Sequence, residues 1–193
     1  NHVLPGVDDG PKTMDGSLEM LRDFAASGYK TVAVSSHMNH HHFPDVSAEL
    51  IRDTVTTVQA KLEEEGIDIQ LLPGCEIFYD DRFLTDLEAG SLIPIGGKGS
   101  YYLIEYSLRD PMLHMKELAF QLSVKGIRPI LAHPERYDVL LRKPELVYGW
   151  KEAGWLMQLD LISLLSNGVR DIRKLAERYI RENVFVMAAT DLF

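Results

Sequence analysis

The sequence predicts an α/β fold in which successive βα units build a parallel sheet, in the manner of a βα barrel. Apolar, β-branched runs alternate with segments of helical period along all 193 residues, and this alternation is typical of βα units. The length and the 46% hydrophobic content suit one well-packed domain and are small for two. We therefore expect a single domain over residues 1–193 with at least six βα units.

Helices are predicted where apolar residues recur every three or four positions. The first, over residues 17–27, places Leu18 and Leu21 on one face and is followed by Gly28 as the expected C-cap. A second carries apolar positions from Leu50 to Leu62 and ends at Gly66. The other helices are expected over residues 81–88, 112–125, 145–153 and 171–182.

The strands between these helices lead to polar residues of one chemical kind. Strands are expected over residues 30–35, 67–72, 101–106, 128–132, 155–159 and 184–188. Five of the strands lead to a side chain that binds metals or transfers protons: His37, Glu76, Glu105, His133 and Asp191. Strand ends converge on one face of a βα barrel, so these residues can meet in one site. Helix capping explains few of them, because N-caps favour Ser, Thr, Asp or Asn.

The mixture of imidazole and carboxylate groups predicts the chemistry of that site. It suits Zn, Mn or Fe, whereas an all-oxygen set would suit Mg or Ca. Several carboxylates in one pocket repel one another unless cations separate them, which indicates more than one metal ion. Two ions can bridge a hydroxide that attacks phosphorus near neutral pH. The residues therefore predict a metal-dependent phosphoester hydrolase.

Composition narrows the classes of partner. The 20 basic and 29 acidic residues give a net charge of -9, which argues against a nucleic-acid partner because phosphates need a basic surplus. No apolar run approaches the roughly 20 residues that span a bilayer. The single cysteine excludes an internal disulfide and favours a reducing compartment, so we expect a cytoplasmic protein.

Five motifs together resemble the polymerase and histidinol phosphatase (PHP) superfamily, and more closely its bacterial protein-tyrosine phosphatases of capsular and exopolysaccharide synthesis. The motifs are His2-Val3-Leu4-Pro5-Gly6-Val7-Asp8-Asp9-Gly10, His37, Pro73-Gly74-Cys75-Glu76, Leu103-Ile104-Glu105 and His133-Pro134-Glu135-Arg136-Tyr137. The resemblance implies a distorted seven-stranded, TIM-like βα barrel that holds two or three divalent ions. Manganese is the expected ion, with Fe, Zn or Co as alternatives. The implied substrate is a phosphotyrosine protein, with a bacterial tyrosine kinase of polysaccharide synthesis as the expected partner.

The same resemblance assigns the metal ligands. The first metal would take His2, Glu76 and Asp191; the second Glu76, Glu105 and His133; the third Asp9 and His37. The family begins with His-x-His, and the first of these would precede Asn1, so we expect a domain truncated at both ends, with an incomplete first strand. Phe193 stands where the family has a last His ligand. Because Phe cannot bind a metal, the third site is the weakest part of this assignment.

Arg136 is predicted to hold the substrate phosphate, because its guanidinium fork can bond two phosphate oxygens. The alternative is an ion pair with Glu135 or a nearby acid. Cys75 is not expected to be a nucleophile: cysteine phosphatases use Cys-x5-Arg, and the sixth residue after Cys75 is Asp81.

Two further points stay open in the sequence. The run His40-His41-His42 is expected to be a solvated loop, with metal or phosphate binding as its alternative. A small-molecule phosphatase acting on a histidinol-phosphate-like substrate, or a degenerate barrel that binds metal without turnover, are the alternatives to tyrosine-phosphatase activity. The sequence predicts no oligomeric state.

Overall fold

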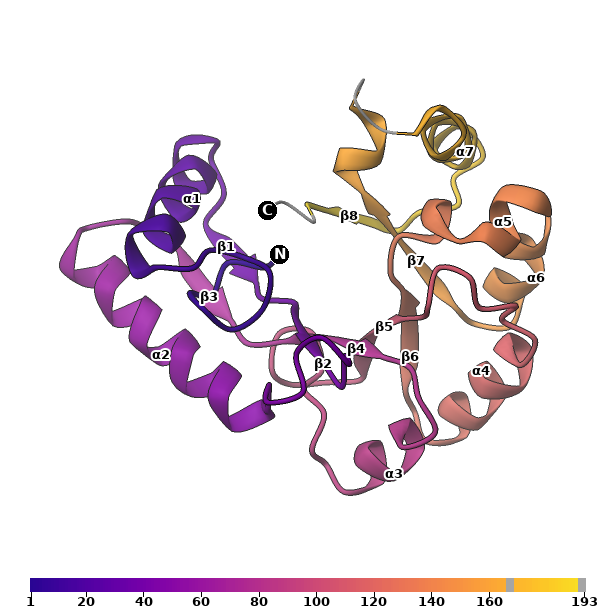
Figure 1. Cartoon of the computed structure of the whole chain (residues 1–193), viewed down its shortest axis with the longest axis horizontal. Coiled ribbons are helices and arrows are strands. Elements are labelled where there is room, and N and C mark those ends of the chain that lie inside the picture. Colours follow the sequence, from indigo (N-terminus) through magenta and orange to yellow (C-terminus); the bar gives the residue numbers. More distant parts are fainter. Residues whose placement is uncertain (166–168, 191–193) are drawn as a thin grey trace. The chain divides into compact units, whose positions relative to one another are not determined.

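A computed structural model describes residues 1–165 and 169–190 and confirms the α/β class (Figure 1). The residues divide into two compact units, one from Asn1 to Gly99 and one that begins at Ser100. Within each unit, neighbouring strands are parallel, as the βα pattern predicts. Closure into a seven-stranded barrel and the single-domain organisation stay predictions.

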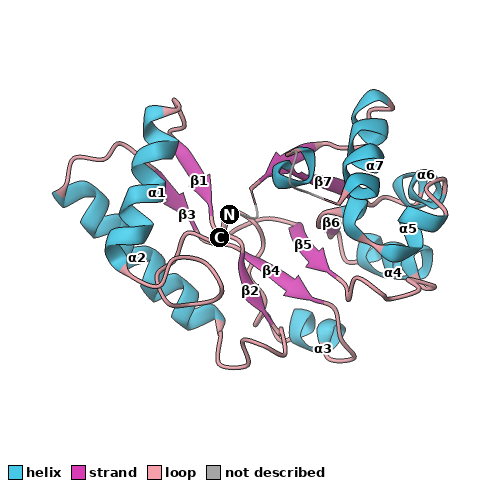
Figure 2. Ribbon diagram, turned by 45° about the horizontal axis from the view of Figure 1, so that its top comes forward, coloured by secondary structure: helices cyan, strands magenta, loops and turns pink. Residues whose placement is uncertain are grey.

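The first unit packs two long helices beside paired strands. Its helices are α1 (Met14–Ala26), α2 (Ala48–Glu64) and α3 (Phe83–Glu88), and its strands are β1 (Thr31–Ala33), β2 (Ser36–Met38), β3 (Gln70–Leu72) and β4 (Cys75–Phe78). Figure 2 shows α1 and α2 side by side along the β1 and β3 pair. Leu18, Leu21, Ile51 and Leu62 are buried between these elements, which confirms the apolar faces predicted from the sequence.

Each of the first two predicted strands, over 30–35 and 67–72, is followed by a further strand that the sequence did not predict. β1 pairs with β3, and after a break of two residues β2 pairs with β4 in the same register. The break on one strand is Pro73-Gly74, where proline has no N–H to donate. Gly74 is required there because a Cβ at this position would lie 2.5 Å from the carbonyl oxygen of Val34. The strands then resume, and His37 lies directly opposite Glu76.

This continuation corrects one detail of the sequence prediction. His37 and Glu76 lie inside β2 and β4, and do not follow the carboxyl ends of their strands. The expected strands over 30–35 and 67–72 correspond to β1 and β3 alone. The sequence pattern missed β2 and β4 because each resumes after a break of two residues, where polar residues such as Ser36, His37 and Glu76 interrupt the apolar run.

The second unit is a four-stranded parallel sheet with helices packed beside it. The strands follow chain order as β5 (Tyr101–Glu105), β6 (Arg128–Leu131), β7 (Leu156–Asp160) and β8 (Met187–Ala189). The helices are α4 (Met115–Val124), α5 (Asp138–Arg142), α6 (Leu146–Glu152) and α7 (Arg170–Arg181), with 3-10 turns η1 (Pro134–Arg136) and η2 (Leu161–Leu164). α4 lies against β6 and α6 (Figure 1).

Helix α4 of this unit begins later than predicted, because the backbone conformation at the predicted start is not helical. The helix expected from residue 112 begins at Met115, because Met112 has a left-handed backbone with φ of 51°. Its N–H donates to the Asp110 carboxylate at 2.6 Å, in a turn that precedes the helix. α5 and both 3-10 turns are too short to leave a periodic signal and were not predicted. Among the described residues, no helix is both long and apolar enough to cross a membrane.

Candidate metal centre

Three predicted ligands converge in the first unit. His2, Asp9 and His37 each offer one ligand atom, and these three atoms lie within 4.8 Å of one another. The rings of His2 and His37 are 4.7 Å apart between centroids. Both histidines are buried, and Asp9 is partly exposed. The chain before His2 is joined to the strand that carries His37, because the carbonyl of Asn1 accepts a hydrogen bond from Ser35 N–H at 3.0 Å, two residues before His37.

Asp8 holds both histidines in place, a role that the sequence reasoning missed. Its Oδ2 lies 2.9 Å from Nδ1 of His2 and accepts the backbone N–H of His37 at 3.0 Å. Its Oδ1 accepts the N–H of Gly10 at 3.1 Å. Burial by itself raises the pKa of Asp8, but the bonds and charge of His2 and the two backbone N–H groups outweigh it and leave the pKa below its usual value. Asp8 is therefore an ionised, buried acceptor.

Gly10 makes this arrangement possible. A Cβ at residue 10 would lie 2.6 Å from the carbonyl oxygen of His2, so only glycine allows the turn to close over the histidine. The run Asp8-Asp9-Gly10 thus directs one carboxylate inward to orient His2 and the next toward the ligand group. The sequence contains two adjacent acids before a glycine, but nothing in that pattern indicates which of the two is buried.

The donor atoms around His2 fit a metal ion. An ionised carboxylate only accepts, so Nδ1 of His2 carries the proton that bonds to Asp8, and in the neutral ring Nε2 has the lone pair. Nε2 lies 3.4 Å from Oε2 of Glu76. Likewise, Nε2 of His37 lies 3.6 Å from Oδ2 of Asp9. A lone pair facing a carboxylate at these distances suits a shared cation, and a carboxylate behind a ligating histidine is the usual outer support of such a site.

A second pair of predicted ligands meets in the second unit. Nε2 of His133 lies 3.4 Å from Oε1 of Glu105. Parallel pairing of β5 with β6 sets this contact, since Ile104 lies opposite Leu131 and each ligand follows within two residues. His133 has φ of 31°, a left-handed conformation uncommon for any residue other than glycine. Such strain persists where the surrounding structure holds it, and it is common at functional sites.

Arg136 lies near these residues, at the end of η1. Its Nη1 is 3.8 Å from Oδ2 of Asp160, and its side chain is half-buried. Asp160 is thus an acid that contacts Arg136, whereas the carboxylate of Glu135 bonds to the N–H of Asp160 and to Ser163. Asp160 ends β7 in the way that Glu105 ends β5, and the sequence analysis overlooked it because its strand was expected to stop at residue 159.

Glu135 faces the interior and supports the turn that carries Arg136. Its Oε1 accepts the N–H of Asp160 at 3.0 Å and the hydroxyl of Ser163 at 2.8 Å. Burial raises the pKa of Glu135 to about 7, against the lowering effect of His133 and these hydrogen bonds. Tyr137, fully buried, accepts the N–H of Tyr106 on its hydroxyl at 3.1 Å. The whole segment from His133 to Tyr137 is therefore tied to β5 and β7.

Cys75 is unsuited to nucleophilic attack. It is fully buried, and its thiol lies 3.1 Å from the carbonyl of Ile93. Burial raises the pKa of the Cys75 thiol to about 12, so the thiolate is negligible near neutral pH. This agrees with the prediction that Cys75 is a small buried side chain.

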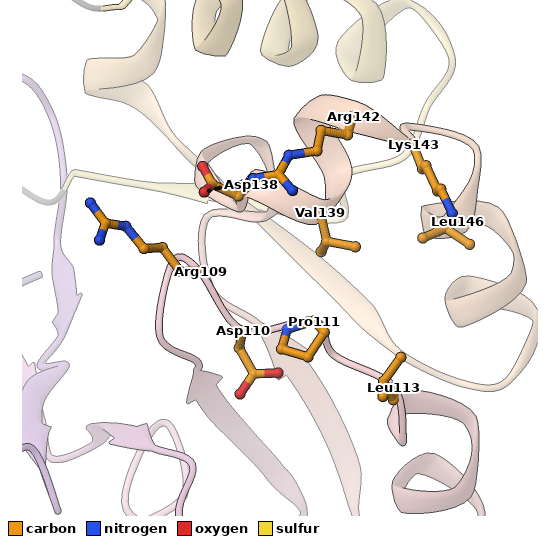
Figure 3. Close-up of a pocket in the computed structure, with 9 residues that line it drawn as sticks. All are labelled: Arg109, Asp110, Pro111, Leu113, Asp138, Val139, Arg142, Lys143 and Leu146. Atoms are coloured by element: carbon orange, nitrogen blue, oxygen red, sulfur yellow. Dashed lines mark hydrogen bonds and ion pairs between the residues drawn. The ribbon is translucent and has the colours of Figure 1, made fainter.

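The second unit also contains a pocket of about 420 Å³ (Figure 3). It is lined by Arg109, Asp110, Pro111, Leu113, Asp138, Val139, Arg142, Lys143 and Leu146. Neither Arg136 nor any predicted metal ligand is among these residues. Asp138 follows Arg136 by two residues, and its N–H donates to the carbonyl of Leu108 at 2.9 Å. This bond links the segment after Arg136 to the residue before Arg109. The residues that line this pocket are therefore different from the predicted metal ligands.

The structure thus groups most of the predicted ligands by unit. His2, Asp9, His37 and Glu76 come together in the first, and Glu105 and His133 in the second. Asp191 and Phe193 lie outside the described residues. The assignment of Glu76, Glu105 and His133 to one metal stays a prediction.

Comparison with known proteins identifies the family. The sequence matches the family described as capsular polysaccharide synthesis, CpsB/CapC, over residues 1–193. The chain belongs to the CpsB/CapC family. The tyrosine-protein phosphatase YwqE of Bacillus subtilis is 28% identical over 190 residues, covering 98% of this chain and 74% of its own. The tyrosine-protein phosphatase CpsB of Streptococcus agalactiae serotype V is 25% identical, covering 100% of this chain and 80% of its own.

A solved structure supports the same relationship. A crystal structure from work on YwqE of Bacillus subtilis and CpsB of Streptococcus pneumoniae, described as metal-dependent tyrosine phosphatases, matches with a TM-score of 0.91. It is 28% identical, and the match covers 98% of this chain and 76% of that one. The resemblance to bacterial protein-tyrosine phosphatases of capsular and exopolysaccharide synthesis, inferred from the motifs, is therefore confirmed.

Proposed function

We propose that this CpsB/CapC chain is a metal-dependent protein-tyrosine phosphatase. The observation that supports it most directly is the convergence of His2, Asp9 and His37 within 4.8 Å, with buried Asp8 behind them. This donor set fits a divalent ion, and related CpsB and YwqE proteins are named tyrosine phosphatases. The proposed role is regulation of capsule or exopolysaccharide synthesis, on a phosphotyrosine protein such as a bacterial tyrosine kinase, in the cytoplasm.

In this proposal seven side chains hold the metals: His2, Asp9, His37, Glu76, Glu105, His133 and Asp191. Two or three divalent ions are expected, with manganese favoured over Fe, Zn or Co. When bound, such ions supply a water that deprotonates near neutral pH and positive charge for the phosphoryl oxygens. The mixed imidazole and carboxylate donors support this class of ion, because a site for Mg or Ca would be built from oxygen donors and a site for soft metals from thiolates.

The remaining tasks fall to residues of the chain itself. Asp8 keeps the His2 ring in one orientation and tautomer, so that Nε2 faces Glu76. Arg136 binds the phosphate of the substrate, for which its guanidinium must leave or share the weak 3.8 Å contact with Asp160. Glu135 holds the backbone that carries Arg136 through its bonds to Asp160 and Ser163. No side chain needs to form a covalent bond to phosphorus, which agrees with the buried thiol of Cys75.

Turnover of two substrates tests the proposal. The metal-free chain and the manganese-loaded chain are assayed with a phosphotyrosine peptide and with histidinol phosphate. We expect manganese-dependent release of phosphate from the peptide and little from histidinol phosphate. Glu76→Ala should abolish turnover because it removes a buried carboxylate that faces His2, whereas Glu49→Ala, on the exposed face of α2, should leave it unchanged.

The other outcomes are equally informative. Faster turnover of histidinol phosphate would replace the proposal with a small-molecule phosphatase. Binding of manganese with no turnover of either substrate would show a metal-binding barrel without activity. A Glu76→Ala variant with normal activity and metal content would refute the ligand assignment itself.

A further inference from the structure

The loop after β2 carries a second group of potential metal ligands. His40, His41 and His42 each offer a ring nitrogen, and these three atoms lie within 4.8 Å of one another. The rings of His41 and His42 are 4.0 Å apart, and that of His40 is within 5.1 Å of both. The solvated loop expected from the sequence is correct for His41 and His42, which are exposed. His40, however, is half-buried.

The loop is ordered around His40 by contacts of its own. The N–H of Phe43 donates to the carbonyl of His40 at 2.9 Å, which closes residues 40–43 into a turn. The N–H of His42 donates to Nδ1 of His40 at 3.2 Å, so in the neutral ring Nδ1 has the lone pair and Nε2 carries the proton. That ring packs edge-on against Phe78 of β4 at 5.0 Å. Two exposed imidazoles therefore lie beside a third whose Nδ1 becomes a metal ligand when the N–H of the exposed His42 turns to water.

The chemistry of this group differs from that of the proposed catalytic centre. Its donors are imidazoles alone, without carboxylate or thiolate, and such sites prefer Zn, Ni or Cu over Mn, Mg or Ca. Zn–N bonds of about 2.0–2.1 Å place the nitrogens of a tetrahedral site roughly 3.4 Å apart. The three nitrogens lie within 4.8 Å of one another. A zinc ion would therefore require the exposed rings of His41 and His42 to rotate about their side-chain bonds, with water as the fourth ligand of a tetrahedral shell.

We propose that His40, His41 and His42 form a separate binding site for one zinc-class divalent ion. The site neighbours the proposed catalytic centre, because the rings of His40 and His37 are 4.8 Å apart. It shares none of the seven proposed ligands of that centre. The inference rests on the geometry of the loop and does not depend on phosphatase activity.

Counting zinc ions per chain tests the proposal. The manganese-loaded full chain is dialysed against buffered zinc, and bound zinc is measured by elemental analysis for the unmodified chain, for His41→Ala/His42→Ala and for His114→Ala. His114 is the matched control because its side chain is 80% exposed and stands apart from the cluster in sequence. We expect the double variant to bind one zinc fewer per chain. Its zinc affinity at this site should fall more than about 100-fold, because losing a ligand costs more than losing an outer partner of a ligand. His114→Ala should bind as the unmodified chain does.

Repeating the count in the Glu76→Ala background separates this site from the catalytic one. The difference of one zinc should persist there, since the loop ligands are untouched. Far-UV circular dichroism melts check that the variants fold, which is expected because His41 and His42 are exposed. Equal zinc content and affinity in the unmodified chain and the double variant would overturn the proposal. An equal loss in His114→Ala would overturn it as well, because it would show that zinc binds surface histidines at random.

Discussion

Replacing Asp8 by Asn should weaken both the fold and the metal centre. The two oxygens of Asp8 serve His2 Nδ1 and two backbone N–H groups, of His37 and Gly10. An Asn amide has one oxygen, and placing it at the Oδ2 position keeps the first two contacts. Its NH2 group then faces the buried N–H of Gly10, donor against donor. The opposite orientation is worse, because it leaves two contacts unmade.

The structure sets the size of this effect. One buried donor without an acceptor costs about 1–3 kcal/mol, and the remaining bonds lose their charged partner, so the free energy of unfolding should fall by roughly 2–3 kcal/mol. For a chain of this length, that lowers Tm by about 4 to 12 °C. His2 also loses the carboxylate that fixes its tautomer, so manganese affinity should fall about 10- to 100-fold.

The assays are urea unfolding of the metal-free chain and manganese titration, both at pH 7. The pKa of Asp8 lies below its usual value of 3.8, so its stabilising effect is complete above that value and is lost as the pH falls through the folded-state pKa. Measurements at pH 7 therefore capture all of it. Asp86→Asn is the matched control, because Asp86 is half-buried in the same unit and accepts the Asn39 amide at 2.9 Å.

Two results would refute the reasoning. An Asp8→Asn variant as stable as the unmodified chain would show that the three contacts of this carboxylate add nothing to the fold. A variant that is destabilised but binds manganese normally would show that Asp8 does not position a metal ligand. Equal losses of stability and manganese affinity in Asp86→Asn would show that the effect comes from replacing any aspartate of this unit by asparagine, and not from the contacts of Asp8.

The remaining predictions test the roles of single side chains in the same assays. Arg136→Lys should raise KM for the phosphotyrosine peptide about tenfold or more at unchanged metal content, because Lys keeps the charge and loses the bidentate fork; unchanged kinetics would leave only the ion pair with Asp160. Cys75→Ser should keep most of the turnover, since the buried thiol has its pKa raised to about 12; a folded, metal-loaded variant without activity would contradict a water nucleophile. Phe193→His should strengthen the third metal site in manganese titration, because it adds a ligand to Asp9 and His37; a third ion that already binds tightly with Phe193 in place would show that another side chain supplies it.

Local patterns were enough to predict most of the elements and to propose the metal ligands. The helices over 17–27 and 171–182 correspond closely to α1 and α7, because a buried apolar face repeats at 3.6 residues within the helix itself. Glu105 was found because it ends a strand of recognisable length. β2 and β4 were not predicted, since each follows a break in the apolar run and contains polar residues, and each depends on pairing with the other.

The sequence by itself determined the class of fold, the family resemblance and the residue types that can bind a metal. Which of two adjacent acids turns inward is a different matter. Asp8 is buried behind His2 because the turn closes at Gly10 and the N–H of His37 comes within reach from a strand far along the chain. Likewise, Asp160 became the partner of Arg136 only when β6 and β7 paired. Only the tertiary structure decided these contacts, because they join segments whose spacing in the sequence carries no periodic signal.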